Sequence, residues 1–286
     1  MTAQAKPKTD ELMDKILFYK NGLRKINKFE RNRLISDAES LRGKISDWDL
    51  FDFFGMIACL YGDTTEAHKN HNLAFEKYKL FCERSNLDYQ APSEDHLYLK
   101  FNYHSTLWVE GLFSQCIEIG KELLEKYPNE FQTIVNLVSA NLFLGKLHES
   151  VKLLNKMEKS ADEHVHYSVI MDAVSLFEKA GLADDDAEKI MNFAFSILHE
   201  KKLFLSDVNA NIVDDCLWID LYVDFPEPVE SVAKEIAKIN WEADGILAKN
   251  ADSKWFDVIM FEFKSVEVLL EEREIIEKKE RISGKW

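Results

Sequence analysis

Apolar residues recur at helical spacing through most of the chain, and glycines interrupt this pattern at regular intervals. One apolar helical run ends near Gly111 and another ends near Gly145, 34 residues later. A second amphipathic run follows each glycine, in CIEIGKELLEK and in SVKLLNKMEK, and the first of these ends at Tyr127-Pro128. The pattern predicts pairs of helices joined by tight turns at the glycines.

The same arrangement extends in both directions along the chain. Gly62 lies 49 residues before Gly111, and Gly181 lies 36 residues after Gly145. The first interval exceeds the period by 15 residues, and we expect this surplus in an elongated helix through KYKLFCERSN and a loop at LDYQAPSED. Residues 9–46 also have a helical pattern, which predicts a degenerate first repeat or a capping pair of helices.

Small residues occupy matching positions next to these glycines. Ala67, Cys116 and Ser150 each follow a glycine by five residues, and Gly55 precedes Gly62 by seven. Small side chains at such positions allow the two helices of a pair to approach closely.

Together, the period and the small residues resemble the tetratricopeptide repeat (TPR), a helix-turn-helix unit of 34 residues, over roughly residues 48–200. The resemblance implies a mainly α fold, a TPR-like helical-hairpin solenoid with a small C-terminal α+β module. We expect residues 1–47 to form an N-terminal helical cap or degenerate repeat and residues 48–200 to form the TPR-like repeats. Residues 201–286 are then an acidic C-terminal module with a terminal helix.

The resemblance also implies a concave groove lined by the first helix of each pair, because stacked pairs form a superhelix. A groove lined by aromatic and aliphatic side chains suits a partner's amphipathic helix or extended apolar segment. Asp49 and Asp52 would then accept a basic residue of that partner, whereas Phe101 and Trp108 could instead be core residues or be covered by the N-terminal helix. The residues expected at the groove are Asp49, Asp52, Met56, Tyr98, Phe101, Ser105, Trp108, Gln132, Val135, Ser139, Leu142 and Met171.

The last third of the chain has a different pattern. The segment CLWIDLYVDF places apolar residues on alternate positions, with Asp220 and Asp224 on the opposite face, which predicts a half-buried strand. PVESVAKEIAKIN predicts a helix, and the aromatic-rich KWFDVIMFEFK favours a second strand over the start of the long helix through SVEVLLEEREIIEKKER. This module could cap the solenoid, form a homodimer through its strand edges, or accept a partner strand.

Charge narrows the possible partners. The net charge is −15, and residues 1–47 carry eleven Lys or Arg against seven Asp or Glu, so the acidic excess lies in the remainder. A mainly acidic surface argues against nucleic-acid binding. The charged start of the chain and the lack of a membrane-length apolar run predict a cytoplasmic protein without membrane contact.

Candidate chemistry is sparse. No phosphate-binding glycine loop, nucleophile elbow or metalloprotease motif occurs, and we expect no cofactor and no metal. The pairs His68 with His71 and His164 with His166 have no further ligands at a diagnostic spacing. The four cysteines are widely separated and predict buried thiols.

These observations predict a non-enzymatic protein-protein interaction module, a cytoplasmic adaptor with a chaperone-like or regulatory role, which binds a protein or peptide. Two alternatives remain at this point. One is a regulatory protein that responds to a small peptide, and the other is an enzyme that uses the acidic C-terminal module.

Overall fold

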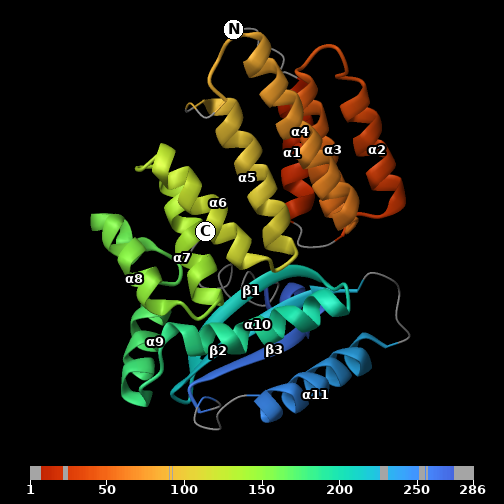
Figure 1. The fold of residues 1–286 in the computed structure, drawn as a ribbon. Helices are drawn as coiled ribbons and strands as arrows, with labels where there is room; N and C mark the ends of the chain where they lie inside the picture. The colour runs from red at the N-terminus through yellow and green to blue at the C-terminus, as the bar shows by residue number, and fades with distance from the viewer. Residues whose placement is uncertain are drawn as a thin grey trace, which may run out of the picture. The chain divides into compact units, whose positions relative to one another are not determined.

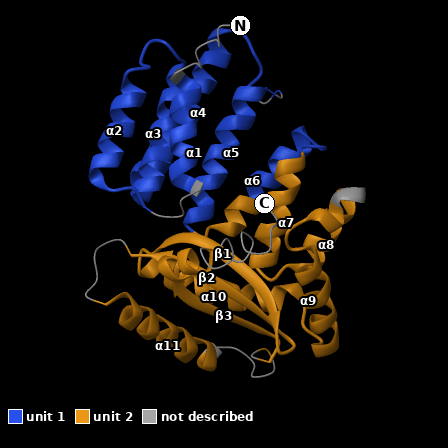
Figure 2. Cartoon of the chain, turned by 180° about the vertical axis from the view of Figure 1, so that it is seen from behind, with its two compact units in different colours: residues 1–110, 118–130 blue, residues 111–117, 131–286 orange. Residues whose placement is uncertain are grey.

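The computed structural model describes residues 8–21, 25–89, 91, 93–225, 231–250, 255 and 257–273. This part of the chain is mainly helical and has a three-stranded sheet toward the C-terminus (Figure 1). It divides into two compact units (Figure 2), where unit 1 holds residues 1–110 and 118–130, and unit 2 holds residues 111–117 and 131–286. None of the described helices combines the length and the apolar character that a membrane span requires.

Unit 1 is built from helices, and one of its helices is shared with unit 2. Its helices are α1 (Lys8–Asn21), α2 (Lys28–Glu39), α3 (Asp47–Tyr61), α4 (Thr64–Arg84), α5 (Glu94–Val109) and the larger part of α6 (Phe113–Lys126). The elongated helix expected between Gly62 and Gly111 is confirmed as α4, which has 21 residues. Asp63 caps its N-terminus by accepting the Glu66 backbone N–H at 3.1 Å.

Unit 2 combines helices with the sheet. Its elements are α7 (Phe131–Phe143), α8 (Leu147–Lys156), the short helix η1 (Glu158–Glu163), α9 (Tyr167–Ala180), α10 (Asp184–Glu200), β1 (Phe204–Val213), β2 (Cys216–Asp224), α11 (Val232–Asn250) and β3 (Ile259–Ser265). Residues 266–273 continue as a helix, and the rest of the expected terminal helix lies outside the described residues.

The glycine turns predicted from the period are confirmed. Gly62, Gly111, Gly145 and Gly181 have φ angles of 80°, 69°, 72° and 65°, in the left-handed region that a side chain disfavours. Space is also limited at Gly145, where an added Cβ would lie 2.5 Å from Ala187 Cβ. The small residues that follow the glycines, Ala67, Cys116, Ser150 and Ala187, are all 0 % exposed.

The last predicted pair of helices departs from the pattern. Gly181 ends α9 as expected, but α10 does not lie alongside α9 as the second helix of a pair would. It runs in a different direction from α9 and packs against α11 and β3 (Figure 1). Helix α9 itself contacts α8 and the strands β1 and β2. The helix that follows the fourth glycine turn therefore packs against the sheet and α11.

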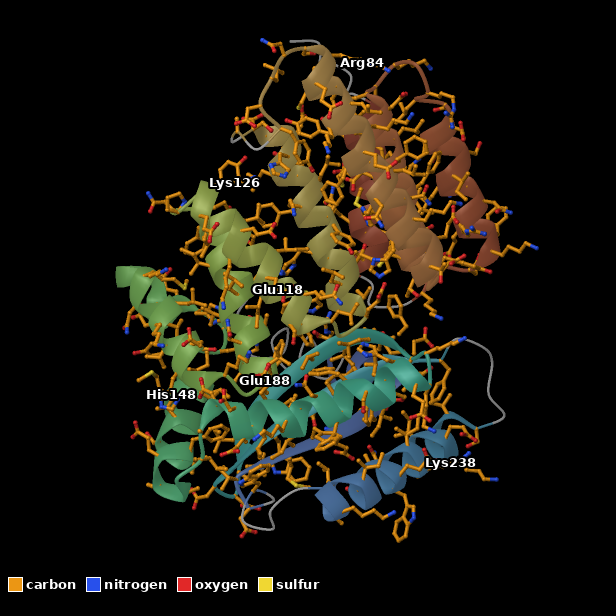
Figure 3. The ribbon with its side chains drawn as sticks, viewed as in Figure 1. Arg84, Glu118, Lys126, His148, Glu188 and Lys238 are labelled. Carbon is orange, nitrogen blue, oxygen red and sulfur yellow. The ribbon has the colours of Figure 1, made fainter. Side chains whose placement is uncertain are left out.

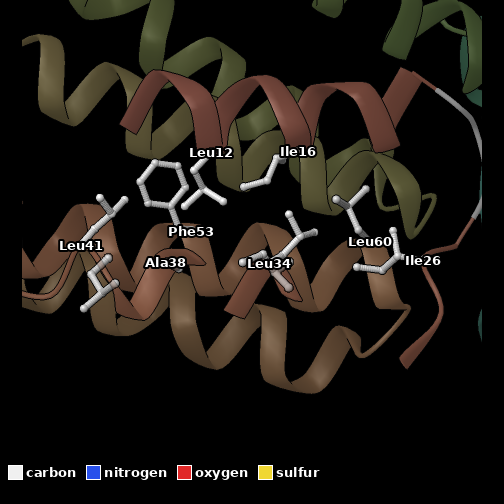
Figure 4. Close-up of a cluster of buried hydrophobic side chains, with 10 residues drawn as sticks. Leu12, Ile16, Ile26, Leu34, Ala38, Leu41, Phe53 and Leu60 are labelled. Atoms are coloured by element: carbon white, nitrogen blue, oxygen red, sulfur yellow. The ribbon is translucent and has the colours of Figure 1, made fainter. Parts of the chain in front are cut away.

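The core of unit 1 joins its first three helices. Leu12 and Ile16 are 2 % exposed and point from α1 toward Leu34, Phe53 and Leu60 (Figure 4). Burying such aliphatic side chains contributes about 1.5–3 kcal/mol each. Helix α1 is thus an integral part of unit 1.

The sheet contains both predicted strands and one more. Strands β1 and β2 form an antiparallel hairpin with a two-residue turn at Asp214 and Asp215, whose φ angles of 49° and 60° match a type I′ turn. Strand β3 pairs in parallel with β2 through the crossover helix α11, so the sheet order is β1-β2-β3. The pattern of CLWIDLYVDF and KWFDVIMFEFK predicted β2 and β3 correctly, whereas β1 was not predicted.

The outer edge of β3 is covered by a side chain. Asn240 of α11 donates from Nδ2 to the carbonyl oxygen of Phe263 at 3.0 Å, and its Oδ1 accepts the Phe263 backbone N–H at 2.9 Å. The side-chain amide of Asn240 thus takes the place of the backbone N–H and carbonyl groups with which a neighbouring strand would pair at Phe263.

Candidate functional site

A pocket in unit 1 brings together two of the residues expected at the groove. It has a volume of about 50 Å³ and is lined by residues of α1, α3 and α5. Met56 of α3 and Ser105 of α5 belong to its lining. The complete lining is Met13, Ile16, Leu17, Lys20, Met56, Cys59, Leu60, Asn102, Ser105, Thr106 and Val109.

The mouth of the pocket carries one positive charge. Lys20 donates from Nζ to Ser105 Oγ at 3.0 Å, and Ser105 in turn donates to the Phe101 carbonyl oxygen at 3.1 Å. Much of the Lys20 side chain is exposed, but its ammonium group lies against the protein. The loss of water around this group lowers its pKa. The remaining lining is largely apolar, so the pocket offers an apolar cavity with a cation at its mouth.

Cys59 contributes a neutral thiol to this pocket. The side chain is 7 % exposed, and burial raises the pKa of the thiol to about 12. A thiol with this pKa is protonated at neutral pH and is a poor nucleophile. All four cysteines are free and buried, as the sequence predicts.

A buried polar network lies beside the pocket and joins α3, α4 and α5. Asp52 Oδ1 accepts a hydrogen bond from His71 Nδ1 at 2.8 Å, because a carboxylate can only accept, and His71 Nε2 lies 2.8 Å from Thr106 Oγ1. Asn102 donates from Nδ2 to Asp52 Oδ2 at 2.5 Å. His71 is 0 % exposed, and Asp52 is 5 % exposed. Both oxygens of Asp52 are therefore occupied inside the unit.

The position of His71 requires a glycine on the facing helix. A Cβ added to Gly55 would lie 2.8 Å from three atoms of the His71 ring. The small residue predicted at the close approach of two helices thus makes room for the imidazole.

A second histidine lies at the same junction of helices. His68 Nδ1 is 3.1 Å from Tyr103 Oη, and His68 Nε2 is 2.9 Å from Glu110 Oε2. The hydrogen bond with the Glu110 carboxylate raises the pKa of His68 above its usual value. His68 and His71 therefore serve as links between helices. Among the described residues, no three His, Cys, Asp or Glu side chains are grouped to hold a metal ion.

The order hydroxyl, imidazole, carboxylate in Thr106, His71 and Asp52 is also that of a nucleophilic triad. Its surroundings differ from those of a working triad in two respects. Thr106 is 1 % exposed, and it lies inside α5, where neighbouring backbone N–H groups are used in the helix and cannot stabilise an oxyanion. The network is therefore arranged to join helices.

The other expected groove residues of unit 1 differ in accessibility. Tyr98 is 64 % exposed on α5, and Phe101 is half-buried one turn further along. Trp108 is half-buried, with its ring centroid 6.0 Å from that of His104. Asp49 is half-buried and accepts the Ser46 hydroxyl at 2.6 Å, and burial raises the pKa of this carboxyl.

The expected groove residues of unit 2 are also mixed. Ser139 and Leu142 are 8 % and 0 % exposed, so they offer no surface to a partner. Gln132 donates to Asn136 Oδ1 at 2.9 Å, and the carbonyl oxygen of Val135 is 3.4 Å from His164 Nε2. Met171 is 40 % exposed.

Sequence reasoning did not identify the partners of Asp52 or the lysine at the pocket mouth. His71 and Thr106 lie 19 and 54 residues from Asp52 along the chain, and no local spacing connects them. One signal was present, because Asp52 lies in the otherwise apolar run LFDFFGMIACLY, where a carboxylate requires a buried partner.

Comparison of the chain with protein-family models, curated proteins and solved structures gives no match, so the candidate site rests on its own geometry.

Proposed function

We propose that this chain is a non-enzymatic protein-protein interaction protein with TPR-like helix pairs. On this proposal unit 1 binds a partner segment whose apolar side chain enters the pocket between α1, α3 and α5. The left-handed glycines and the fully buried small residues that follow them support the repeat architecture.

The observation that carries the proposal is the pocket itself. It combines an apolar lining with Lys20 and Ser105 at the mouth, and Tyr98 is exposed one helical turn before Asn102. A cavity that holds an apolar anchor, with an exposed aromatic residue nearby, is the usual form of a binding hot spot.

Lys20 changes the expected chemistry of the partner. Asp52 is buried and bonded on both oxygens, so it cannot accept a basic residue of a partner. An acidic residue beside the apolar anchor complements Lys20. The proposed ligand is therefore an amphipathic helix or an extended segment with an apolar side chain next to a carboxylate.

Filling the pocket mouth tests this proposal. Ser105→Phe places a large ring at the mouth without removing a core side chain, so partners captured from the native host should be lost. Ser175→Phe is the matched control, because Ser175 also donates to the carbonyl oxygen four residues earlier, at 3.2 Å, and lies in unit 2.

Captured proteins would be identified by mass spectrometry and then titrated against each variant. We expect at least about a tenfold rise in Kd for Ser105→Phe, which corresponds to about 1.4 kcal/mol, and little change for Ser175→Phe. Equal capture by wild type and Ser105→Phe would contradict the proposal, and so would equal losses in both variants.

A further inference from the structure

Helix α11 exposes a tryptophan that the fold of unit 2 does not use. Trp241 is 80 % exposed, more than any other large apolar side chain in the described part of the chain. The opposite side of the helix is well packed, since Ile239, Ala243 and Leu247 are at most 3 % exposed. Helix α11 thus has one face against the sheet and a second face centred on a large aromatic ring in water.

The residues one turn before and after Trp241 on this outer face are very small. Ala237 and Gly245 lie four residues on either side of the tryptophan, and both are exposed. A Cβ added to Gly245 would have no atom within 4 Å. Small residues at this spacing allow another helix to approach closely and leave room for the indole rings.

Two exposed charges of opposite sign lie at equal spacing on either side of Trp241. Lys238 lies three residues before Trp241, Asp244 lies three residues after it, and both are exposed. Figure 3 shows Lys238 pointing away from the sheet. Its nearest acidic group, Glu235 Oε2, is at 4.0 Å, and an exposed ion pair at this distance contributes little.

This arrangement complements itself when two copies of α11 pair in antiparallel orientation about Trp241. Residues three positions before and three positions after the centre then face each other. Lys238 faces Asp244 of the second copy, twice by symmetry, and Ala237 faces Gly245 of the second copy. A parallel pairing would instead place Lys238 beside Lys238.

We infer that the outer face of α11 is a homodimerisation surface, on which a second copy of this chain binds through an antiparallel helix pair centred on Trp241. Two facing helices of 19 residues bury less surface than the roughly 1,600 Å² of a standard interface. The dimer is therefore weak, with a Kd in the micromolar range or above, and becomes weaker with added salt.

The decisive experiment is a charge exchange in the full-length chain, measured by sedimentation equilibrium over a wide concentration range. Lys238→Glu and Asp244→Lys each place two pairs of like charges in contact and should raise the dimer Kd about tenfold or more. The double variant restores both pairs with opposite polarity and should return to within about threefold of wild type. Trp241→Ala should abolish dimerisation.

Lys249→Glu is the matched control, since it makes the same charge change on the same helix but faces Ala233 in the inferred pairing. It should leave the dimer Kd within about threefold of wild type. Neither a charge substitution on this exposed face nor Trp241→Ala removes a core contact, and circular dichroism would verify the fold of each variant.

Three outcomes would overturn the inference. One is a wild type that remains monomeric at the highest concentration, and another is a double variant that is as weak as the single ones. The third is a monomer whose tryptophan fluorescence shifts on phosphatidylserine-containing vesicles in wild type but not in Trp241→Ala, which would assign Trp241, Lys234 and Lys238 to an anionic lipid surface.

Discussion

At the scale of single residues, one imidazole links three helices of unit 1. His71 lies on α4, its partner Asp52 lies on α3, and Thr106 lies on α5, with both contacts at 2.8 Å. Such a contact is costly to break because Asp52 Oδ1 then stays buried without a hydrogen bond, while Asn102 still donates to Oδ2. A hydrogen bond of similar geometry in unit 2, between His148 Nδ1 and Asp184 Oδ1 at 2.7 Å, is more exposed, with 46 % of the His148 side chain accessible.

We predict that His71→Leu lowers the free energy of unfolding by about 3–5 kcal/mol, because Asp52 loses a hydrogen bond in a buried position. His148→Leu should cost less than about 1 kcal/mol, because water solvates the partly exposed pair. Urea unfolding of both variants would measure the difference. Similar costs for the two would show that burial does not set the strength of the His71 contact.

A pair of glycines gives a second test, with effects of opposite sign. Gly55→Ala places a Cβ 2.8 Å from the His71 ring and should destabilise the fold by about 1–3 kcal/mol. Gly245→Ala meets no atom within 4 Å and should stabilise α11 by about 0.4–1 kcal/mol. Thermal unfolding at low protein concentration, where α11 is unpaired, would measure both. Stabilisation by Gly55→Ala would show that the ring can move away.

At the scale of elements, α5 carries two histidines that are uncharged in the folded protein. Burial lowers the pKa of His96 and of His104 to about 4, and nearby lysines add to the effect. Unfolding exposes these groups and returns their pKa to about 6.5. Between these two values the unfolded chain binds more protons, so stability falls as pH falls.

We predict that unfolding free energy decreases from about pH 6.5 to about pH 4, with His104 contributing up to about 3 kcal/mol over this window. His104→Phe keeps a ring beside Trp108 and should flatten the profile. His68 acts in a different pH range: its raised pKa gives stability below pH 6.5 that is lost as pH rises above this value. His68→Phe should therefore remove this loss of stability above pH 6.5. Urea midpoints from pH 4 to pH 8 would test both, and an unchanged slope in His104→Phe would contradict the assignment.

The elements differ in how well the sequence predicts them. Strand β2 has apolar side chains on alternate positions, and β3 is rich in aromatic residues, so both were predicted from local pattern. Strand β1 also alternates, but its polar positions are Asp207, Asn209 and Asn211, residue types that disfavour strands. It becomes a strand because β2 pairs with it along nearly its whole length. The direction of α10 likewise depends on the distant sheet.

Local reasoning reaches a similar limit in the candidate site. The repeat register places Met56 and Ser105 at the expected concave groove, and in the structure both line the pocket of unit 1. The register does not show that α1 covers this surface, because Lys20 and Ser105 are 85 residues apart. It also treats Asp52 as a surface acid, whereas helix packing pairs it with His71.

At the scale of the whole molecule, the chain passes from unit 1 to unit 2, returns to unit 1 and then enters unit 2 again. Residues 113–117 and residues 118–126 of the single helix α6 are assigned to different units. Unit 1 regains the chain at residues 118–130, where Tyr127 forms two hydrogen bonds with the backbone of Ser93, both at 2.7 Å. A cut after residue 110 therefore leaves unit 1 incomplete.

We predict that a fragment of residues 1–110 is less stable than a fragment of residues 1–130. The shorter fragment lacks Tyr127, which accepts the Ser93 N–H and donates to the Ser93 carbonyl oxygen. Tyr127→Phe in the longer fragment should cost about 1–3 kcal/mol for the two lost bonds. Thermal unfolding followed by circular dichroism would compare the three, and equal midpoints for the two fragments would refute the role given to residues 118–130.

The side chain that covers β3 limits what the sheet can build. Fibres grow by adding strands at both edges of every sheet without end. With the Phe263 backbone already bonded to Asn240, addition at β3 is blocked at its centre. A chance pairing of two molecules through their β1 strands would leave a blocked β3 edge on each outer side. Such a pairing would stop at two molecules, which protects the protein from open-ended aggregation.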